Sequence, residues 1–261
     1  MTRRAFALSL VSSAAFAGET AKERGKRLIG KVIEGLGGDA FRNMRTRTEI
    51  GRASSFYREE LTGYSAARLY TKYLEPDSHA NILELQRQVF GKKQEDGAVL
   101  FTTNEGYDVT YRGAKPLADE EVQRFHESTL HDVFYILRER LQEPGIEFEG
   151  AGADIVENQP VETIDIFDAE NRSVRVWVNS DTFVPVKQRY YRWDPTIKER
   201  REEVTRYAKY RSAGGVMWPH SISRERDTEK TFEMNSDRVT VNDPLPDSLF
   251  ELPNGIKILK K

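Results

Sequence analysis

The stretch VRVWVNSDTFVPVKQRYYRWD, residues 174–194, predicts two β-strands joined by a tight turn. Its first part alternates valine with arginine, tryptophan and asparagine, which is the pattern of a strand with one buried face. The second part again has valines on one face, while Phe183 and Tyr191 fall on the other. A soluble hairpin with apolar side chains on both faces can pack a core with one of them. The other face should be exposed to solvent unless it borders an enclosed space.

Segments on both sides of this hairpin continue the alternation of apolar and polar residues, and short turns connect them. We expect about ten to twelve strands, with no βαβ alternation, repeat or linker, and therefore a mainly β fold with an antiparallel sheet. A long antiparallel sheet usually protects its edges by curling toward closure. The sequence therefore predicts a half-open β-barrel with a concave face, although the pattern does not say which side of each strand is concave.

Two segments have helical rather than strand periodicity. The first follows residue 20 and carries an apolar stripe from Leu28 to Leu36, which Gly37 and Gly38 end. The second is an insert in mid-chain, predicted as a helix over about residues 118–143. Its apolar stripe must be buried, so we expect the insert to plug the concave face of the sheet or cap its mouth.

The charge balance and the absence of cysteine exclude several classes of function. The 261 residues include 40 basic and 42 acidic ones, so no overall field favours nucleic acid or anionic lipid. The basic stretch KERREEVTRYAKYR has interleaved glutamates, which favours a solvated strand face over a nucleic-acid site. Without cysteine the chain has no disulfide, no Cys-ligated metal, no Cys nucleophile and no lipid-modified N-terminal Cys.

The N-terminus has the features of an export signal. Arg3 and Arg4 precede an apolar run, and Ala15 and Ala17 form a small-x-small cleavage site. We expect a signal peptide at residues 1–17 and one domain at 18–261, located in the periplasm or secreted. The arginine doublet also resembles a twin-arginine signal. The alternative is that this segment is a short helix of the folded domain. No later apolar run is long enough for a transmembrane helix.

Three segments of the second half together resemble the LolA/LolB-like carriers, which include outer-membrane lipoprotein-sorting proteins. The first is the hairpin VRVWVNSDTFVPVKQ, with Trp177 and Pro185 at the matching positions. The second is YRSAGGVMWPHSISRE, with Gly215 and Pro219. The third is the closing VTVNDPLPDSLFELP. The order and spacing of the three segments carry the resemblance.

The resemblance implies an incomplete antiparallel barrel closed by helices that holds lipid or lipoprotein acyl chains in an apolar cavity. It implies a non-catalytic periplasmic carrier without a cofactor, with partner proteins in the inner or outer membrane. Because a helix that plugs the empty cavity competes with the ligand for the same surface, we expect the insert to gate the cavity through its Leu130–Leu141 stripe. We expect a monomer that binds no nucleic acid. The absence of cysteine argues against a membrane-anchored receptor. The alternative function is an envelope sensor or regulatory module on the same fold, although the known sensors carry a second small domain.

The candidate site is a set of apolar and aromatic residues rather than a catalytic or metal centre. His126 and His131 lie on different helix faces, where we expect them to be solvated, and the metal motif HExxH is absent. Acidic residues 119–121 fit the first turn of a helix better than a catalytic pair. The predicted cavity lining is Phe101, Tyr107, Tyr111, Leu130, Phe134, Leu137, Leu141 and Trp177. The predicted cavity rim is Arg189, Tyr191 and Trp193.

Overall fold

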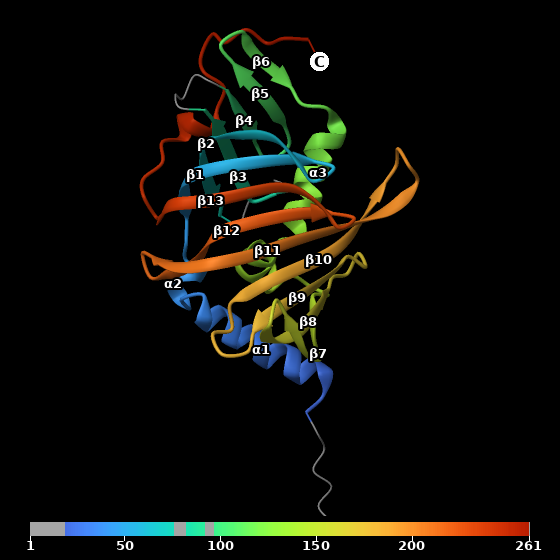
Figure 1. Ribbon diagram of the computed structural model, residues 1–261. Helices are drawn as coiled ribbons and strands as arrows, with labels where there is room; N and C mark the ends of the chain where they lie inside the picture. Colours follow the sequence, from blue (N-terminus) through green and yellow to red (C-terminus); the bar gives the residue numbers. More distant parts are fainter. Residues whose placement is uncertain (1–18, 76–81, 92–96, 261) are drawn as a thin grey trace, which may run out of the picture.

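A computed structural model describes residues 19–75, 82–91 and 97–260, so the predicted signal peptide lies outside the described residues. These residues form one antiparallel sheet that is strongly curved and not closed (Figure 1). In space the strands follow the order β6-β5-β4-β3-β2-β1-β13-β12-β11-β10-β9-β8-β7. The predicted half-open barrel is confirmed, with thirteen strands in the described residues where about ten to twelve were expected.

The strands come in two sequential runs. The first run is β1 (Thr46–Tyr57), β2 (Glu60–Tyr73), β3 (Glu84–Phe90), β4 (Ala98–Phe101), β5 (Gly106–Thr110) and β6 (Gly113–Pro116). The second run is β7 (Glu147–Val156), β8 (Gln159–Phe167), β9 (Ser173–Asn179), β10 (Pro185–Asp194), β11 (Glu199–Ala213), β12 (Val216–Arg226) and β13 (Glu229–Val241). The pairing of β1 with β13 joins the two runs into one sheet.

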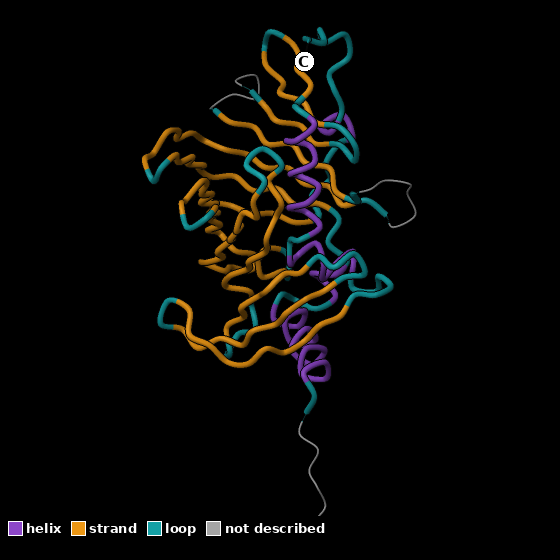
Figure 2. The backbone as a smooth tube through the Cα atoms, turned by 90° about the vertical axis from the view of Figure 1, so that its right-hand side faces the viewer, coloured by secondary structure: helices purple, strands orange, loops and turns teal. Residues whose placement is uncertain are grey.

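Short helices precede and interrupt the strands. They are α1 (Ala21–Gly35), α2 (Asp39–Arg42), α3 (Asp119–Leu130), α4 (Val133–Tyr135), the π-helix η1 (Ile136–Arg140) and the 3-10 helix η2 (Asp247–Phe250). In the view of Figure 2 the helices α1 and α3 lie along one side of the sheet. No helix of the described residues combines the length and apolar character needed to cross a membrane.

The hairpin of residues 174–194 is β9 and β10, and its alternation identifies the concave face. Val176 pairs with Gln188, and Trp177 pairs with Lys187. The valines of β9 belong to the main hydrophobic core, together with buried residues of α1, α4 and η1. The face that carries these valines is therefore the concave face that the helices cover. Trp177 lies on the opposite, convex face.

The insert enters the concave face, but it is not the single helix that the sequence predicted. α3 ends at Leu130, and His131 is its C-cap. Asp132 then has extended backbone angles, and its carboxylate accepts hydrogen bonds from the amides of Phe134 (2.9 Å) and Tyr135 (3.0 Å). Asp132 is therefore the N-cap of α4, which begins a new helix directly after the end of α3. The side chain of Gln188 on β10 accepts a hydrogen bond from the backbone amide of Val133 at 2.9 Å, which ties the first residue of α4 to the sheet.

Phe134 is the aromatic centre of this packing. Its ring lies 4.6 Å from that of Trp218 on β12, 5.0 Å from that of Tyr207 on β11 and 6.3 Å from that of Phe41 on α2. All four side chains are buried. The insert thereby joins the middle of the sheet to the N-terminal helical segment.

We predict that Phe134→Ala lowers the free energy of unfolding by about 3–5 kcal/mol, because it leaves a cavity that rigid sheet residues cannot fill. Urea unfolding followed by circular dichroism measures the change. Tyr111→Ala is the matched control, since the Tyr111 side chain is 81% exposed and its loss should cost at most about 0.5 kcal/mol. Equal effects of the two substitutions would contradict this assignment of the core.

Candidate functional site

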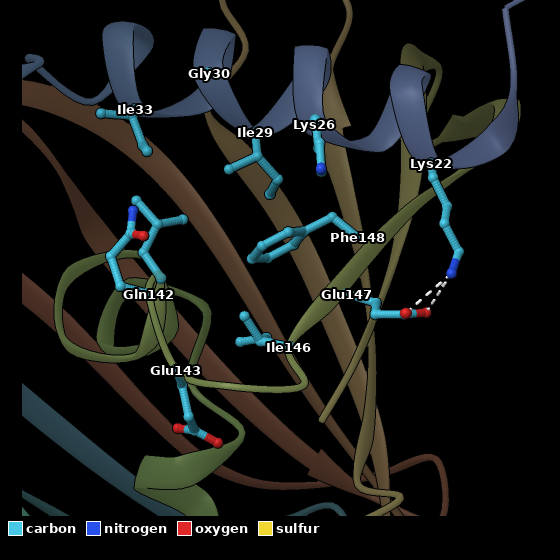
Figure 3. A pocket seen from close by; sticks show the side chains of 11 residues that line it. Lys22, Lys26, Ile29, Gly30, Ile33, Gln142, Glu143, Ile146, Glu147 and Phe148 are labelled. Atoms are coloured by element: carbon cyan, nitrogen blue, oxygen red, sulfur yellow. Dashed lines mark hydrogen bonds and ion pairs between the residues drawn. The ribbon is translucent and has the colours of Figure 1, made fainter. Parts of the chain in front are cut away.

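A cleft of about 600 Å³ lies between α1 and the chain that leads from the insert into β7 (Figure 3). Its apolar lining comes from both walls and consists of Ile29, Ile33, Leu141, Ile146 and Phe148. Polar side chains line the rest: Lys22, Lys26, Gln142, Glu143 and Glu147. Ligand sites typically have volumes of about 300–1,000 Å³ and mainly apolar walls with a few polar groups. The volume of the cleft lies within this range, and its lining divides about equally between apolar and polar side chains.

The wall formed by α1 is held by its N-terminus and by close contact with β7. Thr20 and Glu23 form a reciprocal capping box, which fixes the first turn. Arg24 forms an ion pair with Glu162 on β8 at 2.5 Å. At Gly25 the helix comes so close to the sheet that a Cβ atom would stand 2.2 Å from the carbonyl oxygen of Phe148. Only glycine permits this approach, which sets one end of the cleft.

Gly30, a turn and a half farther along α1, faces open space instead. A Cβ atom at this position would meet nothing within 4 Å, and Gly30 lines the cleft. Glycine inside a helix costs up to about 1 kcal/mol relative to alanine, and nothing in the packing of this position requires it. The missing side chain enlarges the cleft at its centre.

The rest of the concave face is filled by the chain's own side chains and contains a buried ionic cluster. Arg47 on β1 donates to Glu49 at 2.9 Å and also to the hydroxyl of Tyr73, and its guanidinium stacks 4.0 Å from the ring of Trp218. Arg138 of η1 stacks on Tyr73 at 3.8 Å. The insert therefore meets charged groups as well as apolar ones on the sheet.

Glu84 on β3 is a buried carboxyl group close to this cluster. Burial raises its pKa to about 7, and the opposing attraction of Arg47 is too small to offset that effect. Burial likewise raises the pKa of Asp132 and that of Glu139. These carboxyl groups lie where the insert meets the sheet, so this contact is sensitive to pH.

The predicted cavity residues of the insert have different positions in the structure. Leu141 lines the cleft, while Phe134 and Leu137 are fully packed in the main core. Leu130 is half-buried, and its carbonyl accepts a hydrogen bond from Arg140 at 2.6 Å. Phe101 on β4 stacks on Phe125 of α3, with the two rings 4.0 Å apart. The structure thus brings one of the eight predicted lining residues into the cleft.

The other predicted aromatics lie elsewhere. Trp177 is buried on the convex face, where its indole nitrogen donates to Asp154 at 3.0 Å and the ammonium of Lys187 covers its ring at 4.6 Å. Tyr107 packs against a small second core at β3–β6 and donates to Glu105, and Tyr111 is exposed at the β5–β6 turn. None of these three residues lines the cleft.

The three predicted rim residues lie on β10 near the end of the sheet, away from the cleft. Arg189 stacks on both Trp177 and Tyr191, each at 5.5 Å. Tyr191 is exposed and donates to Glu202. Trp193 is exposed and lines a smaller hollow of about 240 Å³ beside α3, together with Arg192. They do not surround the main cleft.

The residues of α1 that line the cleft were predicted only as a helix face, without a role in binding. Ile29 and Ile33 belong to the apolar stripe of α1, and Lys26 and Gly30 lie beside them at helical spacing. A small residue within the stripe next to a lysine is the signal that could have identified them.

The histidine prediction needs a correction. His131 is not solvated: it is buried, stacks on Tyr190 with the rings 4.3 Å apart, and pairs through Nδ1 with the carbonyl of Glu127. It ends α3 in a core position, because the turn before Asp132 points it at the sheet. Across the described ranges, no group of three or more His, Asp or Glu side chains is arranged to hold a metal ion.

Comparison with known proteins finds similarity in structure rather than in sequence. No protein-family model and no curated protein sequence matches the chain. A DUF1329 family protein from Desulfovibrio piger superposes with a TM-score of 0.59 at 12% identity, over 87% of this chain and 97% of that one. A putative outer membrane lipoprotein-sorting protein domain from Vibrio parahaemolyticus gives 0.57 at 13% identity, over 88% and 97%.

A LolA superfamily protein from Nitrosomonas europaea gives a TM-score of 0.49 at 13% identity, over 87% of this chain and 97% of that one. The first two comparisons confirm the resemblance in fold to the lipoprotein-sorting proteins that the sequence suggested. At these identities the likeness concerns the fold.

We predict that Glu84→Gln changes the pH dependence of stability. The raised pKa of Glu84 means that the folded state holds more protons than the unfolded state between about pH 4.5 and pH 7. The proton bound to Glu84 therefore stabilises the folded state fully below about pH 4.5. This stabilisation is lost as the pH rises toward 7, where the carboxylate is charged while buried. The variant should match the wild type near pH 4 and exceed it by about 1–3 kcal/mol above pH 7.

Urea titrations at about pH 4 and about pH 8 measure this difference. Glu60→Gln serves as control, because Glu60 is an exposed carboxylate at the β1–β2 turn. A stability gain of Glu84→Gln that is the same at both pH values would show that burial of the charge is not its cause.

Proposed function

We propose that the protein is a non-catalytic envelope protein that binds the acyl chain of a lipid or lipoprotein. The observation that carries the proposal is the cleft of about 600 Å³ with an apolar floor between α1 and the start of β7. The similarity in fold to a putative lipoprotein-sorting domain supports it. The predicted signal peptide at residues 1–17 supports a periplasmic or secreted location for the domain at 18–261.

The energetics of such a cleft suit a carrier that must also release its cargo. Burial of a methylene group gains about 0.8 kcal/mol, so a long acyl chain supplies several kcal/mol even after the cost of association. The cleft is open to solvent along α1, and Gly30 and Lys26 are exposed. A bound chain is therefore buried only in part, which keeps its affinity moderate and its exchange fast.

The insert provides the proposed gate. Leu141 forms part of the cleft wall and follows η1 directly, so a displacement of η1 from the concave face would lengthen the cleft toward Leu137. Arg140 opposes this displacement, because its guanidinium is paired with Asp168 at 2.6 Å and with Glu143 at 2.6 Å. Competition between insert and cargo for the same apolar surface lowers the net affinity of the cargo and makes transfer to a membrane partner feasible.

We predict that Gly30→Leu strongly weakens acyl-chain binding, because the new side chain extends into the open centre of the cleft. Displacement of a fluorescent fatty-acid probe by palmitate measures the affinity, and we expect a loss of about tenfold or more. Gly30→Ala is the matched control: it should raise helix stability by up to about 1 kcal/mol and leave binding nearly unchanged. Unchanged binding by Gly30→Leu would exclude this cleft as the site.

Native mass spectrometry of the protein isolated from its own envelope distinguishes the carrier from a sensor on the same fold. Co-purified lipid in the wild type and its absence in Gly30→Leu support a carrier. A protein that is empty in both forms and is recovered with a membrane regulator would favour the sensor.

A further inference from the structure

The charges at the cleft are paired with one exception. Lys22 contacts Glu147 at 2.8 Å, and this hydrogen bond raises the pKa of Lys22. Glu143 is held by Arg140 at 2.6 Å. Both carboxylates of the cleft therefore have cationic partners. For Lys26, by contrast, the described part of the chain offers no hydrogen bond or ion pair.

The unpaired ammonium group stands beside the apolar floor. Lys26, Ile29, Gly30 and Ile33 have the spacing i, i+3, i+4 and i+7, so they follow one face of α1. In Figure 3 the side chain of Lys26 extends from α1 toward Phe148, next to Ile29. A ligand that lies along Ile29, Gly30 and Ile33 thus ends at a positive charge.

We infer that the cleft selects single-chain amphiphiles with an anionic head, a carboxylate or a phosphate, which pairs with Lys26 while the chain lies along Ile29, Gly30 and Ile33. This inference rests on the proposed function of the cleft. An anion at Lys26 completes the charge pairing that Glu143 and Glu147 already have, and ammonium–carboxylate and ammonium–phosphate pairs form short, charge-assisted hydrogen bonds. A cationic head would instead be repelled.

The test compares three ligands with the same alkyl chain: palmitate, hexadecyl phosphate and hexadecanol. Their affinities for the full chain are measured by displacement of one uncharged fluorescent acyl probe. Lys26→Gln and Lys26→Glu remove and reverse the charge. Lys31→Gln is the matched control, because Lys31 is on the same helix but contacts the ring of Phe183 at 4.5 Å and does not line the cleft.

We expect one or both anions to bind the wild type about three- to fivefold more tightly than hexadecanol, the size expected of a single exposed ion pair. The tighter of the two anions identifies the head group. Lys26→Gln should abolish the preference, Lys26→Glu should reverse it, and Lys31→Gln should leave it intact. The preference should also decline as salt is added.

Two results would overturn the inference, and they differ from a failure of the proposed function. Equal affinity of all three ligands for the wild type shows that the cleft binds chains without reading the head group. A preference for anions that persists in Lys26→Gln assigns it to another residue. If no ligand binds the wild type, the proposed function itself fails, and the inference fails with it.

Discussion

The contact between Phe134 and the middle of the sheet is the interaction on which the rest of the molecule depends. A sheet of this length that does not close has a concave face as well as two edges, and the apolar side of β9, β11 and β12 needs a cover. Phe134 supplies it by packing on Trp218 and Tyr207. The C-terminal tail protects the β6 edge, where Leu259 and Lys257 exchange backbone hydrogen bonds with Ala114.

Filling the concave face moves the candidate site to the margin of the core. The insert occupies the middle of the curved sheet, and α1 crosses β7 as closely as Gly25 allows. Between them remains the space that Leu141 and Ile33 line from opposite sides. Buried charges at Arg47 and Glu84 limit how well the insert fits the sheet, since each of them loses hydration there.

The sequence determines the architecture well because alternation and connection length are local properties. The valines of residues 174–178 predicted a strand with one core face, and the short turns predicted antiparallel pairing. Alternation does not show which face is concave. Trp177 was therefore predicted to line the cavity, although it lies on the convex face. Its ring is buried by Lys187 and Arg189, residues of the neighbouring strand whose long side chains cover an aromatic ring on the outer face.

The position of the cleft was harder to predict because it depends on tertiary packing. The helical period of the insert passes through residue 132 without a break, yet the carboxylate of Asp132 caps a new helix there and redirects the chain. Ile29 and Ile33 belong to the same apolar stripe as Val32; Ile29 and Val32 are both buried, but only Ile29 and Ile33 line the cleft. Only the path of residues 141–148 decides which of these side chains border open space.

Photo-crosslinking with a diazirine-bearing fatty acid tests the central claim, that the margin between α1 and the start of β7 holds the acyl chain, most directly. After irradiation the labelled peptides are identified by mass spectrometry, with palmitate as competitor. We expect label in Ala21–Gly35 and in residues 141–148 that palmitate suppresses. Competed label confined to the convex face around Trp177, or label that palmitate does not reduce, would contradict it.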